Sequence, residues 1–338
     1  MTLRAGVIGC GNRGRRHAAG YLAADQVELV ACAEPKEENR LAFCEQFHVS
    51  RAYTDYREML AKEKLDIVSI CTWTGQHREM IEEAARSGVR AIHSEKPMAT
   101  NWGDAKALYQ ACQERGVAIT FCHQRRFEAS FVKAKQLLDA GAIGDLYRME
   151  AGCDNMFDWG THWFDMFFFF NNEEPAEWVI AQIDVAKRKE VFAAPVDTGG
   201  VSWVRFRNGV EGLLATGSAM MGGARIRLLG SEGIIEIMGS DGAPVRIRRR
   251  GAGEWEPVAL DAGVPNAQAT VASVLDLLDA LKTGREPLLS GRKALQATEL
   301  IFATYESSRR RGQVRLPLDV DDSALIAMLD TGMIGPKA

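Results

Sequence analysis

The sequence lacks the features that mark several classes of protein. Its seven cysteines include no C-x-x-C pair, which argues against a zinc ribbon or dithiol redox motif and is typical of reduced thiols. No apolar run approaches the ~20 residues of a membrane-spanning helix, and Asp165 directly precedes the apolar run Met166–Phe170. No signal peptide precedes the first expected strand. The net charge of −4 argues against nucleic-acid and anionic-membrane partners. We expect a soluble cytoplasmic protein with no metal site.

The chain is long enough for two domains, and residues 1–121 form the first that we expect. At 338 residues, with 46% hydrophobic and 25% charged residues, the composition is that of a globular protein. Within 1–121, short apolar runs alternate with segments of helical periodicity, which predicts an α/β domain with a doubly wound parallel sheet of the Rossmann type. The expected strands are Leu3–Ile8, Gln26–Ala33, Arg51–Tyr53, Asp66–Cys71, Val89–His93 and Val117–Phe121.

A glycine-rich turn, Gly9-Cys10-Gly11-Asn12-Arg13-Gly14, follows the first expected strand. In a dinucleotide fingerprint the first glycine allows a tight turn and the second lets the backbone approach a pyrophosphate. The third lets the next helix pack closely on the strand. The helix N-terminus then offers free N–H groups to the phosphates. Because the turn follows a strand and opens a helix, it predicts nucleotide binding by Gly9, Gly11, Asn12, Arg13 and Gly14.

An acidic residue, Glu34, at the end of the second expected strand bears on whether the cofactor is NAD or NADP. Glu34 is expected to bind the adenosine ribose hydroxyls, and its charge would repel a 2′-phosphate, which favours NAD over NADP. Lys36 and Arg40 could neutralise such a phosphate, so NADP stays possible; both are otherwise ordinary residues of a solvated helix face. We expect NAD.

Residues 122–318 have a different pattern, which predicts an α+β domain with a large open mixed or antiparallel sheet. An open sheet with helices on one side leaves its other face to be covered, so we expect a homodimer or homotetramer. Residues 319–338 form a tail with a short helical pattern. The expected strands are Leu146–Cys153, Glu177–Ala186, Val201–Arg207, Val210–Gly217, Arg225–Leu229, Ile234–Met238 and Pro244–Arg249, with a turn at Asp241-Gly242 and helices near Asn266–Lys282 and Gly291–Arg311.

Two short motifs could carry chemistry. Glu95-Lys96-Pro97 ends the fifth expected strand, and Asp158 precedes a helix expected from about Gly160 to Phe170, with His162 in its first turn. A histidine beside a carboxylate can accept the hydroxyl proton of an alcohol during hydride transfer. Both motifs also have a structural explanation. Lys96 could be a surface lysine before a turn proline, and Asp158 and His162 could be the cap and a hydrogen-bonded histidine of an ordinary helix. The spacing of the residues does not decide between a catalytic and a structural role.

The ordered set of motifs resembles the glucose–fructose oxidoreductase, inositol dehydrogenase and MocA family. The likeness extends to about Leu318. It rests on the glycine-rich turn, Thr72-Trp73-Thr74-Gly75-Gln76-His77, Glu95-Lys96-Pro97, Arg125-Arg126-Phe127, Asp158-x-x-x-His162, Leu229-Gly230-Ser231-Glu232-Gly233 and Gly291-Arg292-Lys293-Ala294-Leu295.

The resemblance implies roles for individual residues. Lys96 would bind the reacting oxygen, His162 would serve as general base or acid, and Asp158 would orient the site. Glu95 would contact the nicotinamide ribose, and the lysine–proline bond is often cis in relatives. Further cofactor contacts are implied at Thr72, Trp73, Thr74 and His77, and substrate contacts at His123 and Arg125, whereas Arg126 could be structural.

One departure from the family concerns the substrate. The segment between the expected strand Leu146–Cys153 and Asp158 is shorter than in relatives, which leaves Asp154, Asn155 and Trp159 as candidates for the pocket wall, with Asn155 and Trp159 as the expected substrate contacts. Polar hydroxyl acceptors and aromatic faces suit sugars and cyclic polyols. We expect an NAD(P)-dependent dehydrogenase acting on a secondary alcohol of a sugar, inositol, polyol or glycoside. The alternatives are a glycoside hydrolase or lyase that oxidises its sugar transiently, and a catalytically silent sugar or nucleotide sensor.

Overall fold

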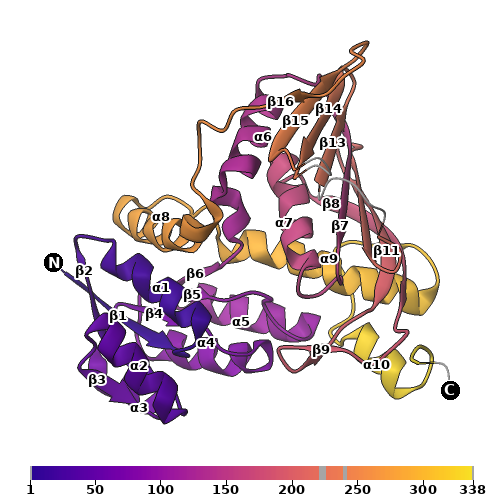
Figure 1. Ribbon diagram of the computed structural model, residues 1–338. Coiled ribbons are helices and arrows are strands. Elements are labelled where there is room, and N and C mark those ends of the chain that lie inside the picture. Colours follow the sequence, from indigo (N-terminus) through magenta and orange to yellow (C-terminus); the bar gives the residue numbers. More distant parts are fainter. Residues whose placement is uncertain (1, 221–225, 239–241, 337–338) are drawn as a thin grey trace. The chain divides into compact units, whose positions relative to one another are not determined.

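The computed structural model describes residues 2–220, 226–238 and 242–336 (Figure 1). The described chain divides into two compact units. The first comprises residues 1–100, 104–124 and 266–295, and the second comprises 101–103, 125–265 and 296–338. Within the described residues, no helix is both long enough and apolar enough to cross a membrane.

The first unit contains the expected doubly wound sheet. Its six strands are parallel and lie in the order β3-β2-β1-β4-β5-β6, so the strand order reverses beside β1. Strands buried on both faces explain the uninterrupted apolar runs of the sequence. The strands are β1 (Leu3–Ile8), β2 (Val27–Ala33), β3 (Arg51–Tyr53), β4 (Ile67–Ile70), β5 (Ala91–Ser94) and β6 (Ala118–Phe121), and the intervening helices are α1 (Asn12–Leu22), α2 (Glu37–Phe47), α3 (Tyr56–Glu63), α4 (His77–Arg86) and α5 (Trp102–Glu114).

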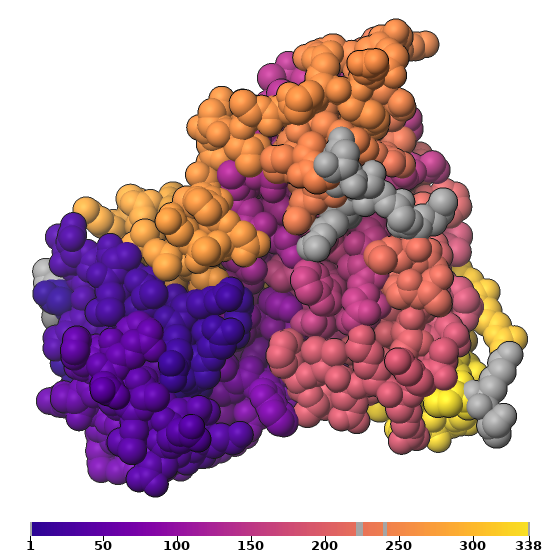
Figure 2. Space-filling view, in the orientation of Figure 1, coloured from indigo at the N-terminus to yellow at the C-terminus, as the bar shows by residue number. Residues whose placement is uncertain are grey.

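A helix from the later part of the chain completes the first unit. Helix α8 (Ala269–Thr283) packs on α1 (Figures 1 and 2). A Cβ added to Gly20 would lie 2.6 Å from the Val274 Cβ. His93 on β5 also contacts Ser273, through its Nε2 at 3.0 Å. The expected division at residues 121 and 122 therefore differs from the observed units, because this helix buries its apolar face against the N-terminal segment.

The second unit is built on a nine-stranded mixed sheet in the order β16-β15-β14-β13-β7-β12-β11-β8-β17. The β7–β12 pair is parallel and the other pairs are antiparallel. The strands are β7 (Leu146–Cys153), β8 (Ala176–Asp184), β11 (Gly199–Phe206), β12 (Glu211–Gly217), β13 (Ile226–Gly230), β14 (Gly233–Ile237), β15 (Val245–Arg249), β16 (Glu256–Pro257) and β17 (Val314–Arg315), with a separate hairpin of β9 (Glu190–Val191) and β10 (Ala194–Pro195). Arg225 and Asp241, which belong to the expected strand and turn, lie outside the described residues.

Helices cover one face of this sheet. Helices α6 (Ala129–Asp139) and α7 (Gly160–Phe170) pack on its strands. The buried hydroxyls of Thr304, Ser307 and Ser308 on α9 (Gly291–Arg310) form hydrogen bonds with β8 and β11. Side chains on the other face are partly exposed, among them Ile180 and Trp203. The described part of the tail contains α10 (Ala324–Asp330), with Leu325 and Met328 buried; the final two residues lie outside the described chain.

Candidate active site

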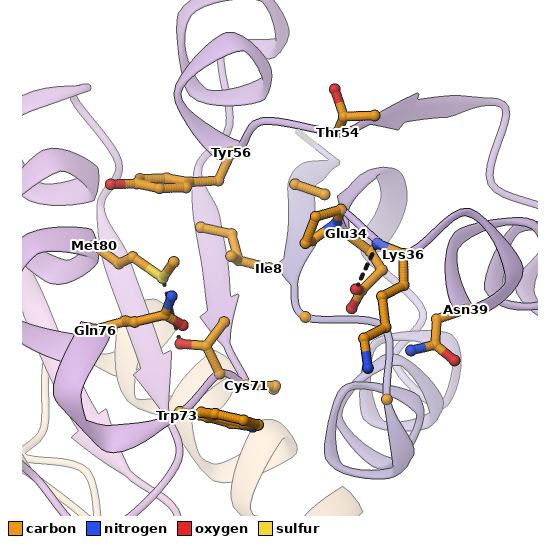
Figure 3. A pocket seen from close by; sticks show the side chains of 15 residues that line it. Ile8, Glu34, Lys36, Asn39, Thr54, Tyr56, Cys71, Trp73, Gln76 and Met80 are labelled. Atoms are coloured by element: carbon orange, nitrogen blue, oxygen red, sulfur yellow. Dashed lines mark hydrogen bonds between the residues drawn. The ribbon is translucent and has the colours of Figure 1, made fainter. Parts of the chain in front are cut away.

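A cavity of about 390 Å³ lies at the carboxyl ends of the central strands of the first unit. This edge, at the point where strand order reverses, is where open α/β sheets bind ligands. Figure 3 shows Lys36 and Asn39 on one side of the cavity and Gln76 and Met80 on the other. The lining residues are Ile8, Gly9, Gly11, Ala33, Glu34, Pro35, Lys36, Asn39, Thr54, Tyr56, Cys71, Thr72, Trp73, Gln76 and Met80.

The glycine-rich turn forms one wall of the cavity with the expected geometry. Gly9 has a φ of +91°, and a Cβ there would lie 2.6 Å from the Cys71 carbonyl oxygen. A Cβ on Gly14 would overlap the carbonyl oxygen of Gly9, which explains why α1 needs glycine at this point. A Cβ on Gly11 would meet nothing, so the backbone is open to a ligand. Asn12 and Arg13 follow in the first turn of α1.

Glu34 lies in the cavity wall at the end of β2, and the protein fixes its carboxylate. Its Oε2 accepts the Cys10 backbone N–H at 3.0 Å, and its Oε1 accepts that of Lys36 at 3.0 Å. Arg40 donates through one guanidinium nitrogen to the Glu34 carbonyl oxygen at 2.8 Å. A carboxylate held at this strand end is placed as the ribose-binding acid of a dinucleotide site requires.

The opposite wall follows β4. Trp73 is 61% exposed and lines the cavity, so its ring is open to a ligand rather than packed in the core. Thr72 also lines the cavity and donates its hydroxyl to the Met80 sulfur at 3.3 Å. The Tyr56 hydroxyl is buried and, among the described residues, has no hydrogen-bond partner. These open and unsatisfied groups, with the bare backbone at Gly11, fit a bound dinucleotide.

Two of the expected cofactor contacts lie behind this wall. His77 is fully buried, with Nδ1 3.0 Å from the Pro97 carbonyl oxygen and Nε2 3.3 Å from that of Thr72. Burial lowers the pKa of its imidazole. Thr74 is also buried. His77 therefore links the turn after β4 to the triplet that follows β5, and its expected contact with the cofactor stays a prediction.

The Glu95 carboxylate accepts hydrogen bonds from two side chains of α1, Arg13 and His17. Its Oε1 accepts from Arg13 Nε at 2.6 Å and from His17 Nε2 at 3.1 Å. Although burial opposes ionisation, these donors hold the pKa of the carboxyl well below its usual range. The side chain of Arg13 thus extends from the glycine-rich turn to Glu95 of the Glu95-Lys96-Pro97 motif. The carboxylate is buried within the unit, and its expected contact with a nicotinamide ribose stays a prediction.

Lys96 follows as a half-buried side chain, and its backbone N–H lies 3.3 Å from Glu95 Oε2. The Lys96–Pro97 bond is cis, in agreement with the resemblance. His123, expected to touch substrate, is buried in the same unit and donates its backbone N–H to the Phe121 carbonyl oxygen at 2.7 Å.

The second unit brings Asp158 and His162 to the start of α7, which runs over the expected residues. Both are buried. The turn before them is closed by Asn155, whose Oδ1 accepts the Asp158 N–H at 2.7 Å and whose carbonyl accepts the Gly160 N–H at 2.9 Å. Asn155 is fully buried and supports this turn, and its expected contact with substrate stays a prediction.

Sequence reasoning missed the carboxylate that fixes this turn. Asp197, which is fully buried, accepts the Met156 N–H at 2.9 Å, the Thr216 hydroxyl at 2.9 Å and the Tyr305 hydroxyl at 2.9 Å. Burial outweighs these bonds and raises its pKa to about 6. No local pattern marks Asp197 because its partners come from three distant parts of the chain.

Aromatic rings surround Arg125, the first residue of the Arg125-Arg126-Phe127 motif. The Arg125 guanidinium lies 4.7 Å from the centre of the Trp163 ring and 5.6 Å from that of Trp159. Trp159 is 38% exposed and presents an aromatic face beside Asp158. Such a ring can stack on the apolar face of a sugar.

Arg126 has the structural role that the sequence left open. It is buried and donates to both carboxylate oxygens of Asp165, at 2.8–3.1 Å, and to Glu173. Asp165 is therefore engaged by this guanidinium, which leaves Asp158 as the stronger candidate to act with His162.

The family models and solved structures agree with this architecture. Residues 3–123 match the oxidoreductase family model described as an NAD-binding Rossmann fold, and 135–316 match that of the C-terminal alpha/beta domain of the same family. A dehydrogenase from Bordetella pertussis, solved with NADH and UDP-GlcNAcA, is 24% identical, with a TM-score of 0.77 and coverage of 94% of this chain and 100% of that one.

Two named relatives cover most of the chain. The D-apiose dehydrogenase of Paraburkholderia graminis is 27% identical over 92% of this chain and 88% of its own length. The myo-inositol 2-dehydrogenase of Thermotoga maritima is 27% identical over 93% of this chain and 98% of its own length. The chain belongs to the glucose–fructose oxidoreductase, inositol dehydrogenase and MocA family and is an NAD(P)-dependent oxidoreductase.

Proposed function

We propose that the protein oxidises a secondary alcohol of a sugar, inositol or other cyclic polyol, or reduces the corresponding ketone. The proposal is supported above all by Lys96, a half-buried ammonium that directly follows an ionised, fixed carboxylate after β5. Relatives named as dehydrogenases of apiose and myo-inositol support the substrate class. NAD, when bound, supplies the hydride acceptor.

The remaining roles belong to the protein's own side chains. We assign to Lys96 the hydrogen bond to the reacting oxygen, and to His162 the exchange of the hydroxyl proton. A neutral imidazole is suited to this exchange near neutral pH. Asp158 orients the imidazole and accepts a neighbouring hydroxyl of the substrate. Trp159 offers its exposed face to the ring of the sugar, beside the Arg125 guanidinium.

Glu34 supports a preference for NAD over NADP. Its carboxylate is fixed by two backbone N–H groups, so it cannot turn away from an added 2′-phosphate without losing both bonds. Lys36 lines the cavity and Arg40 is hydrogen-bonded to the carbonyl oxygen of Glu34, so either cation could offset part of this repulsion.

The decisive experiment is a panel of sugars and polyols with NAD and with NADP, followed by nicotinamide absorbance and product analysis. We expect reduction of NAD with at least one cyclic polyol or sugar. Lys96→Ala should abolish turnover while NAD affinity stays within about tenfold, because transition-state contacts affect rate more than cofactor binding. Lys62→Ala, a change to an exposed lysine on α3 paired with Glu58, is the matched control.

Two outcomes of this panel would overturn the proposal. One is a cofactor that binds with no turnover of any substrate, which would favour a sensor. The other is NAD that co-purifies and supports product formation with no net NADH, which would favour transient oxidation by a hydrolase or lyase.

The same proposal includes a homodimer formed through the open face of the nine-stranded sheet. Ile180, Val201, Trp203 and Leu213 line a groove of about 390 Å³ on β8, β11 and β12. Exposed apolar side chains in one patch favour an interface. Alternating charges continue across the neighbouring strands through the pairs Arg205–Glu211, Arg148–Glu211, Arg227–Glu150, Arg227–Glu236 and Arg246–Glu236. Because both signs are present, a second copy can meet this face without net repulsion.

A further inference from the structure

A buried chain of hydrogen bonds leads from α1 to the triplet that carries Lys96. The Tyr21 hydroxyl lies 2.8 Å from Ser69 Oγ, and Ser69 Oγ lies 3.1 Å from His17 Nδ1. The opposite nitrogen of the ring, Nε2, lies 3.1 Å from Glu95 Oε1. Tyr21, Ser69 and His17 are fully buried. The function proposed above uses none of these three side chains.

The donors and acceptors of this chain can be assigned from its ionised end. The Glu95 carboxylate only accepts, so His17 must donate through Nε2–H. In a neutral ring Nδ1 then accepts, and the single proton of the Ser69 hydroxyl is donated to it. The oxygen of Ser69 accepts in turn from the Tyr21 hydroxyl. Each proton has an acceptor only if His17 is the neutral Nε2–H tautomer.

The stacked neighbour of this ring is neutral as well. The centre of the His93 ring lies 4.5 Å from that of His17, and burial holds the His93 pKa well below its usual range. Ser273 donates to the Thr270 carbonyl oxygen at 2.6 Å, so His93 Nε2–H donates to Ser273, and Thr120 donates to His93 Nδ1 at 2.8 Å.

Among the described residues, the neighbours of His17 other than Glu95 carry no negative charge that could accept its Nε2–H. Burial raises the pKa of the Cys122 thiol to about 12, so this neighbour is uncharged. His17, His93 and Cys122 present ligand-type atoms within 4.8 Å of one another. All four imidazole nitrogens, however, lie against hydroxyl or carboxylate oxygens. The arrangement is therefore that of a hydrogen-bond network rather than of a metal site.

We propose that His17 is a positioning residue for Lys96, acting through Glu95. It donates one hydrogen bond to the carboxylate from within the protein, where water does not compete, while the more exposed Arg13 donates the other. The second carboxylate oxygen, Oε2, accepts the backbone N–H of Lys96. Fixing the carboxylate therefore also fixes the backbone from which the lysine side chain extends. This role rests on the function proposed for Lys96.

The first test is spectroscopic and needs no substrate. Long-range ¹H–¹⁵N spectra of protein labelled at its six histidines, with His17 assigned by the signals missing in His17→Gln, report the tautomer of each ring. We expect His17 as the neutral Nε2–H form at pH 7. In Ser69→Ala the same form should persist, because Glu95 still accepts from Nε2–H, while the ¹⁵N shift of Nδ1 should move because its hydrogen-bond donor is gone. A cationic ring, or an Nδ1–H form in the wild type, would overturn the assignment.

The second test separates positioning from packing. His17→Leu removes the donor, whereas His17→Gln retains an amide N–H that can reach Glu95. We expect kcat to fall by about tenfold or more in the leucine variant, as the loss of a charge-assisted bond predicts, and to recover in the glutamine variant. The dissociation constant of NAD, measured by tryptophan fluorescence, should change little in either. Equal loss of kcat in both variants would contradict the proposal.

The two tests also distinguish this inference from the function on which it rests. If Lys96→Ala retains turnover, the proposed role of Lys96 fails while the tautomer of His17 stays as assigned. If the leucine variant does not fold, Ser69→Ala still tests the network, because it leaves the imidazole in place and removes only the hydroxyl proton donated to Nδ1. A wild-type spectrum of His17 in Ser69→Ala would overturn the inference.

Discussion

Arg13 Nε lies 2.6 Å from Glu95 Oε1, so the dinucleotide turn and the triplet carrying Lys96 share one ion pair. The two segments are far apart in the sequence, and the contact forms because α1 begins at the same edge of the sheet at which β5 ends. A single guanidinium thus links the expected cofactor-binding turn to the expected catalytic lysine.

We expect Arg13→Leu to impair both functions of this ion pair. Removal of one of the two side-chain donors on the Glu95 carboxylate should lower kcat by about tenfold, the usual effect of losing a charge-assisted bond. NAD affinity should also fall, because the side chain stands in the first turn of α1. Steady-state kinetics and fluorescence titration measure the two effects. Arg15→Leu, which removes an exposed contact with Gln46, is the control, and an equal effect of both changes would contradict the assignment.

Glu34→Ala should weaken NAD binding by about tenfold or more, since a charged hydrogen-bond acceptor for the ribose is lost. The preference over NADP should shrink as well, because the repulsion of a 2′-phosphate disappears. Parallel titrations with NAD and NADP test this, with the exposed Glu37→Ala in α2 as control. Unchanged discrimination between the two cofactors would show that Glu34 does not read the ribose.

Asp197 should make the protein less stable as the pH rises from about 4 to about 6. Its folded pKa, about 6, exceeds the ordinary value of 3.8, so the folded state retains a proton that the unfolded state has released. The favourable contribution is complete below the unfolded pKa and disappears above the folded one, and amounts to about 2–3 kcal/mol. Urea unfolding of wild type and Asp197→Asn at several pH values measures it.

In Asp197→Asn this part of the pH dependence should vanish, because the amide does not titrate. Asp184→Asn, a change to an exposed carboxyl at the end of β8, should leave the wild-type dependence intact. A wild-type slope between pH 4 and 6 in the Asp197 variant would assign the effect to another group.

Trp203→Glu should convert the proposed dimer to a monomer, since it places a charge in the apolar groove between Ile180 and Leu213. Sedimentation velocity gives the molar mass of both forms in solution. Leu41→Glu, at a more exposed apolar side chain on α2, should not change it. A monomeric wild type would remove the proposed role of the open sheet face.

The sequence predicted best those features that depend on short stretches of chain. The tight turn at Gly9, the packing at Gly14 and the bounds of α7 follow from local sterics and from the period of the apolar residues. A strand end can be located in the same way, which is why Glu34 was expected at the cofactor site; Trp73 was expected there only from the resemblance to the family.

The supporting groups could not be found in this way. His17 looks like one residue of an amphipathic helix until β4 and β5 bring Ser69 and Glu95 to its two nitrogens. Asp197 resembles any loop carboxylate, although its partners lie near α7, on β12 and on α9. Asn155 has a side chain suited to substrate, but the turn before α7 uses it for backbone hydrogen bonds.

Because α8 packs on α1, the first unit cannot be separated from the rest of the protein by a single cut in the chain. A fragment ending near residue 124 would contain all six parallel strands, yet it would expose the surface around Gly20 and deprive His93 of its Ser273 partner. A hybrid enzyme that takes its whole first unit from a relative therefore has to exchange residues 266–295 together with the N-terminal segments 1–100 and 104–124.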